Sequence, residues 1–389
     1  MNDFIFENKT TLIFGKDAES KVGATTQEFG VKKALVCYGQ GSAKKSGLLD
    51  RVFKSLSDSK VTFCEYGGIS ANPHKTHTLD GIKFAIKNKC DFILAVGGGS
   101  VIDAAKCIAI GAVDSDVWEY YLGNKEDIKN ALPIGTILTL PAAGSEGSAA
   151  SVIRDEKTGL KYAVGSDVLR PKFSFINPAL MFTLPSEQIA FGASDILAHL
   201  LERYFSPQDN VVLTDNLLTG AIKSLFTAAT NVYNDNTNYD YWAEFCLLGT
   251  LAHNDFLSLG RNCQDWATHN IENTFLSGIH NIAHGAGLAI IFLAWLKLVS
   301  QLRPKKILQF CNEVMGASGK TDDEITLNGI NKLEQFYKSI NLPIRLSDVN
   351  VSADQIISQV AAVYKGTTSL GGYGKLTVDE IKRIIELAK

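Results

Sequence analysis

The chain has 389 residues, which exceeds the size of one ordinary hydrophobic core and predicts two domains. Hydrophobic residues make up 46% and charged residues 20%, a balance typical of a globular protein with ample core material. The formal net charge of -3, the pI of about 6.2 and the lack of a polybasic run argue against nucleic acid and anionic membranes as partners.

The seven cysteines are widely spaced and form no CxxC pair, which is typical of a reducing compartment. The first residues, MNDFIFENKT, lack the charged and then apolar pattern of a signal peptide. The apolar stretch at 286–299 is too short to cross a bilayer comfortably, so we interpret it as a buried helix. We therefore expect a soluble cytoplasmic protein with no membrane partner.

Short β-branched runs alternate with amphipathic stretches in the first part of the chain. The predicted strands and helices, in chain order, are a strand at 32–39, a helix at 46–59, a strand at 60–68, a helix at 76–89, a strand at 90–99, a helix at 100–112 and a strand at 133–141. This alternation predicts an α/β domain with a parallel sheet that helices cover on both faces.

The pattern changes where Pro178 and Pro185 interrupt the chain. From Ser186 onward the segments are long, rich in Leu and Ala, and periodic at helical spacing, which predicts an all-α C-terminal domain. The last helix is expected to start at Thr377, where Glu380 completes a capping box. We place the domains at 1–183 and 184–389.

A glycine-rich loop, VGGGSVID, joins the strand at 90–99 to the next helix. Gly97, Gly98 and Gly99 allow close approach of a pyrophosphate, because they carry no Cβ. The helix that opens near Ser100 offers free N–H groups and a positive dipole end. A tight turn without ligand is the alternative, since the segment is not the GxGxxG fingerprint of a standard dinucleotide fold.

A second turn, YGQGSAKKSG, follows the first predicted strand. Gly39 stands where an NAD-selective enzyme often places a carboxylate for the ribose hydroxyls, and no carboxylate lies between Cys37 and Gly47. Ser42 and Lys45 could instead hold a 2′-phosphate, with Lys44 beside them. This pattern favours NADP(H), although a polar turn with solvated lysines is the alternative.

A third segment, TLPAAGSEGSA, follows the strand at 133–141. Thr139 and Ser145 are hydroxyl donors at the carboxyl end of a strand, where open α/β sheets bind ligands. Lys161 could reach a phosphate or a ribose, and a solvated surface lysine is the alternative.

Four side chains in the C-terminal half, those of Asp195, His199, His269 and His284, indicate a metal site. Asp195 and His199 are four residues apart, so a helix presents both on one face. His269, His280 and His284 follow within a short segment. Carboxylate and imidazole bind divalent transition metals. The alternatives are a hydrogen-bonded core histidine at 199 and an ion pair at 195.

The motifs resemble those of the iron-containing (group III) alcohol dehydrogenase family, in its butanol dehydrogenase and NADPH-dependent aldehyde reductase branch. The resembling stretches cover nearly the whole chain in order: FGKD, YGQGSAKKSG, ANP, GGGSVIDAAK, TLPAAGSE, PKFSFINP, FTLP, SDILAHLLERYF, DWATH and AHGAGLAI. The resemblance implies a dehydroquinate synthase-like architecture and hydride transfer between NADP(H) and a primary alcohol or aldehyde.

The resemblance also implies roles for individual residues. The metal, usually Fe²⁺ and in some members Zn²⁺, would be bound by Asp195, His199, His269 and His284. The cofactor would be bound by three glycine-rich or hydroxyl-rich segments and by one lysine. The residues that would contact it are Gly39, Gly41, Ser42, Lys45, Gly97, Gly98, Gly99, Ser100, Asp103, Thr139, Ser145 and Lys161.

Two departures from the family pattern bear on catalysis. The spacing between His269 and His284 is one residue longer than is common, so a bulge or a shifted turn is needed to keep both side chains inward. The position where the family often carries a proton-relaying histidine is Asn273, which cannot titrate. The proton relay would then have to be water, a cofactor ribose hydroxyl, or His280 brought closer by the extra residue.

Other functions stay open at this point. They are a glycerol dehydrogenase-like polyol enzyme, a dehydroquinate synthase-like lyase, and a degenerate family member that binds nucleotide and metal without turnover. A homodimer is expected, because it is the commonest symmetric assembly.

Overall fold

A computed structural model describes residues 1–261 and 263–389. The chain divides into two compact units. The α/β unit comprises residues 7–184 and 236–254, and the helical unit comprises residues 1–6, 185–235 and 255–389. These units differ from the expected domains 1–183 and 184–389 at residue 184 and in two longer segments. Residues 1–6 pack with the helical unit, and 236–254 pack with the α/β unit.

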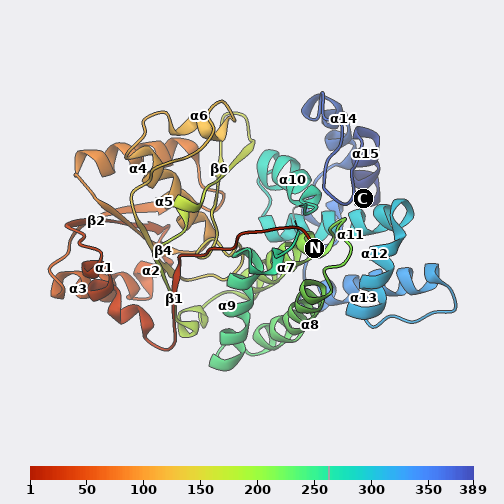
Figure 1. The fold of residues 1–389 in the computed structure, drawn as a ribbon, viewed down its shortest axis with the longest axis horizontal. Coiled ribbons are helices and arrows are strands. Elements are labelled where there is room, and N and C mark those ends of the chain that lie inside the picture. Colours follow the sequence, from red (N-terminus) through yellow and green to blue (C-terminus); the bar gives the residue numbers. More distant parts are fainter. Residues whose placement is uncertain (262) are drawn as a thin grey trace. The chain divides into compact units, whose positions relative to one another are not determined.

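The α/β unit is built on a six-stranded parallel sheet (Figure 1). Its strand order is β1-β8-β5-β4-β2-β3. The strands are β1 (Thr11–Phe14), β2 (Lys33–Gly39), β3 (Thr62–Ile69), β4 (Phe92–Gly97), β5 (Ile134–Leu138) and β8 (Phe173–Ile176). The central strands β4 and β5 are buried along their whole length, as expected for a parallel sheet covered on both faces.

Helices cover both faces of this sheet. The helices and short helical turns of the unit are η1 (Ala18–Lys21), α1 (Val22–Glu28), α2 (Ser42–Lys45), α3 (Leu48–Asp58), α4 (Lys75–Lys87), α5 (Gly99–Gly111), α6 (Val117–Tyr121), η2 (Asp167–Leu169), η3 (Pro178–Met181) and α9 (Tyr239–His253). One core cluster joins α1 and α3 to alternate residues of β2 and β4, whereas α4 and α5 pack together on the other face (Figure 1).

The predicted elements of this half lie within a few residues of the observed ones. An antiparallel hairpin was missed, formed by β6 (Ala150–Arg154) and β7 (Lys161–Gly165). The strands β1 and β8, which pair with each other in parallel, were also missed. Both are only four residues long, which is too short for a periodicity signal.

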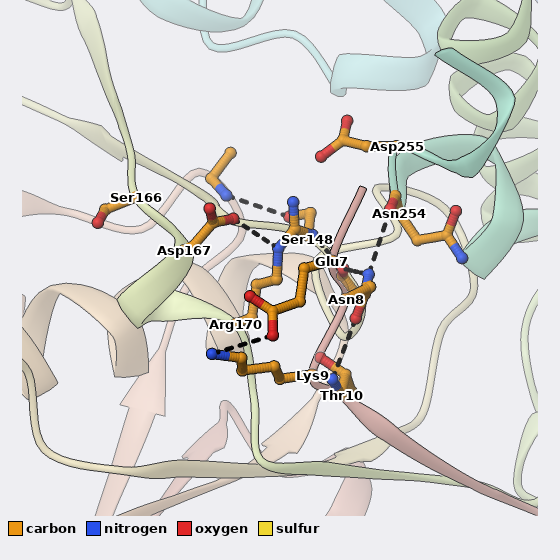
Figure 2. A network of polar contacts seen from close by, with 12 residues as sticks. Glu7, Asn8, Lys9, Thr10, Ser148, Ser166, Asp167, Arg170, Asn254 and Asp255 are labelled. Carbon is orange, nitrogen blue, oxygen red and sulfur yellow. Dashed lines mark hydrogen bonds and ion pairs between the residues drawn. The ribbon is translucent and has the colours of Figure 1, made fainter. Parts of the chain in front are cut away.

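A polar network fixes the entry to β1 (Figure 2). The Asn8 side-chain amide donates to the Gly147 carbonyl at 3.0 Å and to the Asn254 carbonyl at 3.2 Å. The buried Arg170 also donates to the Gly147 carbonyl, at 2.9 Å, and to the Asp167 carboxylate at 2.9 Å. These bonds join the ends of the unit's two chain segments to the loop between β5 and β6.

The described residues of the helical unit form helices and one isolated bridge between Leu370 and Leu376. Its elements are α7 (Ser186–Tyr204), α8 (Val212–Asn234), η4 (Phe256–Ser258), α10 (Ala267–Ile271), η5 (Glu272–Ile279), α11 (His284–Leu302), α12 (Pro304–Gln309), η6 (Phe310–Val314), α13 (Asp322–Ser339), η7 (Leu346–Val349), α14 (Ala353–Val363) and α15 (Val378–Leu387). The expected capping box between Thr377 and Glu380 is present at the start of α15.

The helix α11 is the apolar stretch that the sequence indicated as a buried helix. By length and composition it could cross a membrane, but 78% of its apolar window is buried inside the protein. It packs against α7 and α15. We therefore describe it as the central core helix of this unit.

Candidate metal centre and glycine-rich loops

The helix α7 carries the first part of the site. Nearly every residue from Ile189 to Tyr204 is buried, because α8 and α11 pack along this helix. Asp195 and His199 lie one turn apart in this apolar setting, and Asp195 Oδ1 is 3.5 Å from His199 Nδ1. A charged carboxylate is costly in such an environment unless cations or donors surround it.

Two more histidines approach the same carboxylate oxygen from other helices. His269 on α10 places Nε2 3.8 Å from Asp195 Oδ1, and His284 at the start of α11 places Nε2 3.6 Å from it. The rings of His199 and His269 stack with centroids 4.7 Å apart. Donor atoms of Asp195, His199 and His269 all lie within 4.8 Å of one another, a spacing suitable for holding a cation.

Two buried glutamates hold the outer nitrogens of these rings. Glu202 Oε1 is 3.1 Å from His269 Nδ1 and accepts the His269 backbone N–H at 3.0 Å. Glu272 Oε2 contacts His284 Nδ1 and accepts from the Ser277 hydroxyl at 2.9 Å. A carboxylate at Nδ1 fixes the proton there and leaves the lone pair on Nε2. Both rings therefore turn Nε2 toward Asp195.

The extra residue between the two histidines is accommodated by a π-helix. The segment η5 runs directly from α10 and is wound as a π-helix, which takes more residues per turn than an α-helix. The fifteen-residue separation of His269 and His284 therefore still allows both side chains to reach Asp195.

Glycines in the AHGAGLAI segment make this packing possible. A Cβ at Gly287 would lie 2.6 Å from Glu272 Oε1, and a Cβ at Gly285 would lie 2.1 Å from the Phe191 carbonyl of α7. The absence of side chains at these two positions lets α11 approach both the buried glutamate and α7.

The charge of the centre fits a divalent cation. Burial opposes protonation of His269, but the carboxylates of Asp195 and Glu202 outweigh it and raise its pKa to about 9. Three buried carboxyl groups, those of Asp195, Glu202 and Glu272, surround these histidines, and a bound cation would balance their charge. In the described part of the chain, the buried Nε2 of His269 has no hydrogen-bond partner. Nitrogen and oxygen donors of this kind suit Fe²⁺ or Zn²⁺.

In the α/β unit, the GGGS loop joins β4 to α5. No side chain caps the N-terminus of α5, so its first N–H groups are available to an anion. Side chains are disfavoured sterically here, because a Cβ at Gly97 would lie 2.5 Å from Val101 and one at Gly99 would lie 2.8 Å from Ala143. Ser100 lies in the first turn of α5.

A buried lysine, which the sequence reasoning did not single out, organises the neighbouring loop. Lys106 on α5 donates to the carbonyls of Ser145, Ser148 and Ala150 at 2.7–2.9 Å. Burial lowers the pKa of Lys106 to about 8, although Asp103 and Glu146 oppose that shift. A lysine within the apolar run VIDAAKCIAIGA was the signal that could have identified it.

Asp103 and Ser145, expected as cofactor contacts, take part in the same network. The Ser145 hydroxyl donates to Asp103 Oδ1 at 2.6 Å, and the Val152 backbone N–H donates to Asp103 Oδ2 at 3.1 Å. Burial raises the pKa of Asp103, and the positive charge of Lys161, at the start of β7, opposes that rise. Thr139 follows β5, and its backbone N–H donates to the Gly97 carbonyl at 3.1 Å.

The YGQGS turn follows the carboxyl end of β2. Gly41 has φ of +141°, a conformation that favours glycine, whereas the φ of Gly39 is outside this positive region. A Cβ at Gly39 would meet only ordinary contacts, the nearest being the Ile69 carbonyl oxygen at 3.6 Å. Packing therefore does not require glycine at 39. Ser42 and Lys45 belong to the short helix α2 and are exposed.

The two expected proton-handling residues lie on or beside η5. Asn273 is half-buried in its first turn, directly after Glu272. His280 ends the segment, and its Nε2 has no hydrogen-bond partner among residues 1–261 and 263–389. Burial lowers the pKa of His280, so this ring is neutral near pH 7.

Together, a parallel α/β unit with a glycine-rich loop and a helical unit with an Asp–His centre define a class of metal-dependent dehydrogenases. Residues 9–178 match the family described as iron-containing alcohol dehydrogenase, and residues 189–389 match the C-terminal family of Fe-containing alcohol dehydrogenases. The chain belongs to the iron-containing alcohol dehydrogenase family and is thus an oxidoreductase acting on alcohols.

Individual relatives are similar over their full length. The chain is 36% identical to the probable NADH-dependent butanol dehydrogenase 1 of Bacillus subtilis, covering 99% of both chains. It is 33% identical to the NADPH-dependent aldehyde reductase YqhD of Escherichia coli, covering 100% of both. A crystal structure of NADH-dependent butanol dehydrogenase A from Thermotoga maritima matches with a TM-score of 0.95 at 34% identity, covering 100% of this chain and 99% of that one.

Proposed function

We propose that this protein reduces a short aldehyde to a primary alcohol, and catalyses the reverse oxidation, with NADP(H) and a divalent metal. The observation that carries the proposal is the approach of three imidazole nitrogens to Asp195 Oδ1 at 3.5–3.8 Å. Relatives named as butanol dehydrogenases and an aldehyde reductase support the substrate class.

The metal would be held by Asp195, His199, His269 and His284, with Fe²⁺ as the first choice and Zn²⁺ as the alternative. When bound, such a cation supplies Lewis acidity toward a substrate oxygen. Glu202 and Glu272 keep the His269 and His284 rings in the tautomer that offers Nε2. The apolar packing around α7 keeps bulk water away and strengthens these electrostatic interactions.

The proton required at the substrate oxygen is assigned to His280, with Asn273 as an orienting amide. Neutral imidazole can accept a proton and imidazolium can donate one, so a histidine can relay protons near physiological pH, whereas an amide can only donate and accept hydrogen bonds. The unsatisfied Nε2 of His280, in the described residues, supports this assignment.

The cofactor would bind the loops at the carboxyl ends of the strands. Gly97, Gly98, Gly99 and Ser100 would receive the pyrophosphate at the N-terminus of α5. Thr139 and Lys161 would contact the nicotinamide side. Asp103 and Ser145 would support that contact through the loop that they join to α5.

We infer NADP(H) rather than NAD(H) from the turn after β2. Gly39 and Gly41 leave space for a 2′-phosphate, and Ser42 and Lys45 supply a donor and a charge. The relatives use both cofactors, since some are named as NADH-dependent and one as NADPH-dependent. A Gly39→Asp variant should shift kcat/KM toward NADH, because a carboxylate repels the 2′-phosphate. Equal kcat/KM values for NADPH and NADH in the parent would refute the inference.

Metal content and activity test the main proposal together. Purified protein, assayed for NADPH loss with butyraldehyde, should lose activity on chelation and regain it with Fe²⁺ or Zn²⁺. His269→Ala should lose metal and activity together, whereas His253→Ala, which replaces a histidine of the α/β unit, should retain metal. Cofactor binding without aldehyde-dependent NADPH loss would instead identify a family member that binds its ligands without turnover.

Location and assembly complete the proposal. Each of the seven cysteines is free, which suits the reducing cytoplasm. A homodimer is the assembly we propose, and sedimentation of the purified protein at a mass near 84 kDa, about twice the chain mass of 42.2 kDa, would support it.

A further inference from the structure

A cavity of about 420 Å³ lies within the helical unit. It is lined by the loop after α7, the start of α8, the junction of α11 with α12, and Gly372, Tyr373 and Lys375. None of these lining residues belongs to the Asp–His centre or to the expected cofactor loops at 39–45, 97–103 and 139–145. All of them lie in the helical unit.

Cations outnumber carboxylates around this cavity. The lining cations are Arg303, Lys305, Lys306 and Lys375, and the lining carboxylates are Asp209 and Asp215. Lys305 pairs with Asp209 at 3.2 Å, and both side chains are exposed. Arg303 uses Nε to donate to the Gly374 carbonyl at 3.1 Å. Among the described residues, neither Arg303 nor Lys375 has a carboxylate partner.

A second imbalance of charge lies at two lining residues, Asp215 and Lys306, and at Arg261, which contacts Asp215 but does not itself line the cavity. Lys306 Nζ lies 2.6 Å from Asp215 Oδ2, and Arg261 contacts the other oxygen of the same carboxylate. The Arg261 side chain is fully buried, and its Nε and Nη1 have no hydrogen-bond partner within the described chain. One carboxylate thus serves two cations, the buried Arg261 and the partly buried Lys306. Glu313 also attracts Lys306, but it is exposed and accepts from the Gln309 amide at 3.0 Å.

Backbone groups add to this positive field. The cavity includes Val211 and Val212, where α8 begins. Val211 supplies no side-chain cap, so the first-turn N–H groups of this 23-residue helix lack that partner. The positive end of the helix dipole therefore faces the same space as the lysines and arginines. Both contributions favour an anion.

The walls of the cavity are partly apolar and well fixed. The Tyr373 hydroxyl donates to the Arg303 carbonyl at 2.8 Å and accepts the Lys306 backbone N–H at 3.2 Å. These bonds hold the Tyr373 ring beside the start of α12. Leu302, Pro304 and Val212 add exposed apolar surface to the lining. A ligand with an organic part as well as a charged head would use both surfaces.

We propose that this cavity binds a small organic phosphate, with its phosphate group among Arg303, Lys306 and Lys375 and its organic part against Tyr373. A phosphate carries close to two negative charges at neutral pH and several acceptor oxygens, which matches the excess of cations and N–H donors. This site is additional to the proposed dehydrogenase chemistry and does not depend on it.

Calorimetric titration with phenyl phosphate and with inorganic phosphate tests the proposal. The parent should bind both, and phenyl phosphate should bind more tightly because its ring can pack on Tyr373. The double variant Arg303→Ala/Lys375→Ala should lose about tenfold or more in affinity for both probes, since it removes two charge-assisted contacts. Both residues are exposed, so an unchanged Tm should accompany the loss.

The matched control is Lys338→Ala/Lys382→Ala, which makes the same change of charge on α13 and α15 of the same unit. This control should bind as the parent does. The proposal fails if the parent binds neither probe, if the double variant binds as tightly as the parent, or if the control loses as much affinity as the double variant. Equal affinity for the two probes would overturn the organic part of the assignment. A phosphate bound at the GGGS loop would be unaffected by both variants.

Discussion

The substitution Glu202→Gln tests whether the buried Glu202 carboxylate orients His269 for metal binding. The glutamate is fully buried and accepts the His269 backbone N–H at 3.0 Å, with His269 Nδ1 at 3.1 Å. Glutamine preserves the shape of the side chain but removes the negative charge. We expect the ring of His269 to lose basicity and fixed orientation, because the carboxylate no longer stabilises the proton at Nδ1.

The expected loss in metal affinity is about 10- to 100-fold, or about 1.4–3 kcal/mol, the usual effect of removing such a supporting partner. Competition with a chromophoric chelator measures it without any need for activity. Glu146→Gln is the matched control, because Glu146 is also buried and accepts from the Thr250 hydroxyl at 2.6 Å in the α/β unit. If Glu202→Gln folds like the parent and binds metal equally well, the supporting role assigned to Glu202 is wrong.

Three further predictions concern stability and pH. Burial and the charge of Glu202 raise the pKa of Asp265 to about 7, so its contribution to stability is complete below about pH 4 and is lost as pH rises to about 7. Relative to Asp265→Asn, the parent's free energy of unfolding should therefore fall by on the order of 4 kcal/mol over that range, and parallel curves from urea denaturation would contradict this. Gly287→Ala should destabilise the protein by about 1–3 kcal/mol and weaken metal retention, because the new Cβ would lie 2.6 Å from Glu272 Oε1. The control Gly220→Ala, whose Cβ meets open space on α8, should be neutral or stabilising. Lys106→Met should lower the free energy of unfolding by about 3 kcal/mol or more, because it leaves the buried carbonyl acceptors without their donor and the carboxylates of Asp103 and Glu146 without their cation. Chemical denaturation measures this loss, and a smaller one would show that the network relaxes.

Much of the fold could be predicted from the sequence because its signals are local. The strand at 90–99 is a continuous apolar run that ends in glycines, and it corresponds to β4 and the start of α5. The capping box at Thr377 is also local, since it requires only residues three apart. Such patterns depend on neighbouring residues and need no knowledge of tertiary contacts.

The missing parts depend on contacts between distant residues. The chain returns to the α/β unit at 236–254, where Thr250 bonds Glu146 and His253 bonds the Ala143 carbonyl at 2.8 Å. No local pattern in an ordinary amphipathic helix reveals which unit it joins. The apolar run around Lys106 is a local sign of its burial, but its five oxygen partners could not be predicted, because they lie 39–44 residues away.

In the candidate metal centre, too, local patterns could be predicted and contacts between distant residues could not. The spacing of Asp195 and His199 predicted a shared helix face, and the structure brings both to His269. The roles of Glu202 and Glu272 could not be predicted, because a glutamate in a helical sequence is usually a solvated surface residue. Only the packing of α7, η5 and α11 buries them.

The interrupted path of the chain between its two units has a consequence during synthesis. The sheet is complete in sequence once residue 184 has left the ribosome, but α9 follows only at residue 254, after 185–235 of the other unit. At about 5–20 residues per second, the nascent sheet waits roughly 4–14 s for that helix. During this interval the surface that α9 later covers is exposed, and exposed surface of this kind favours aggregation and chaperone binding.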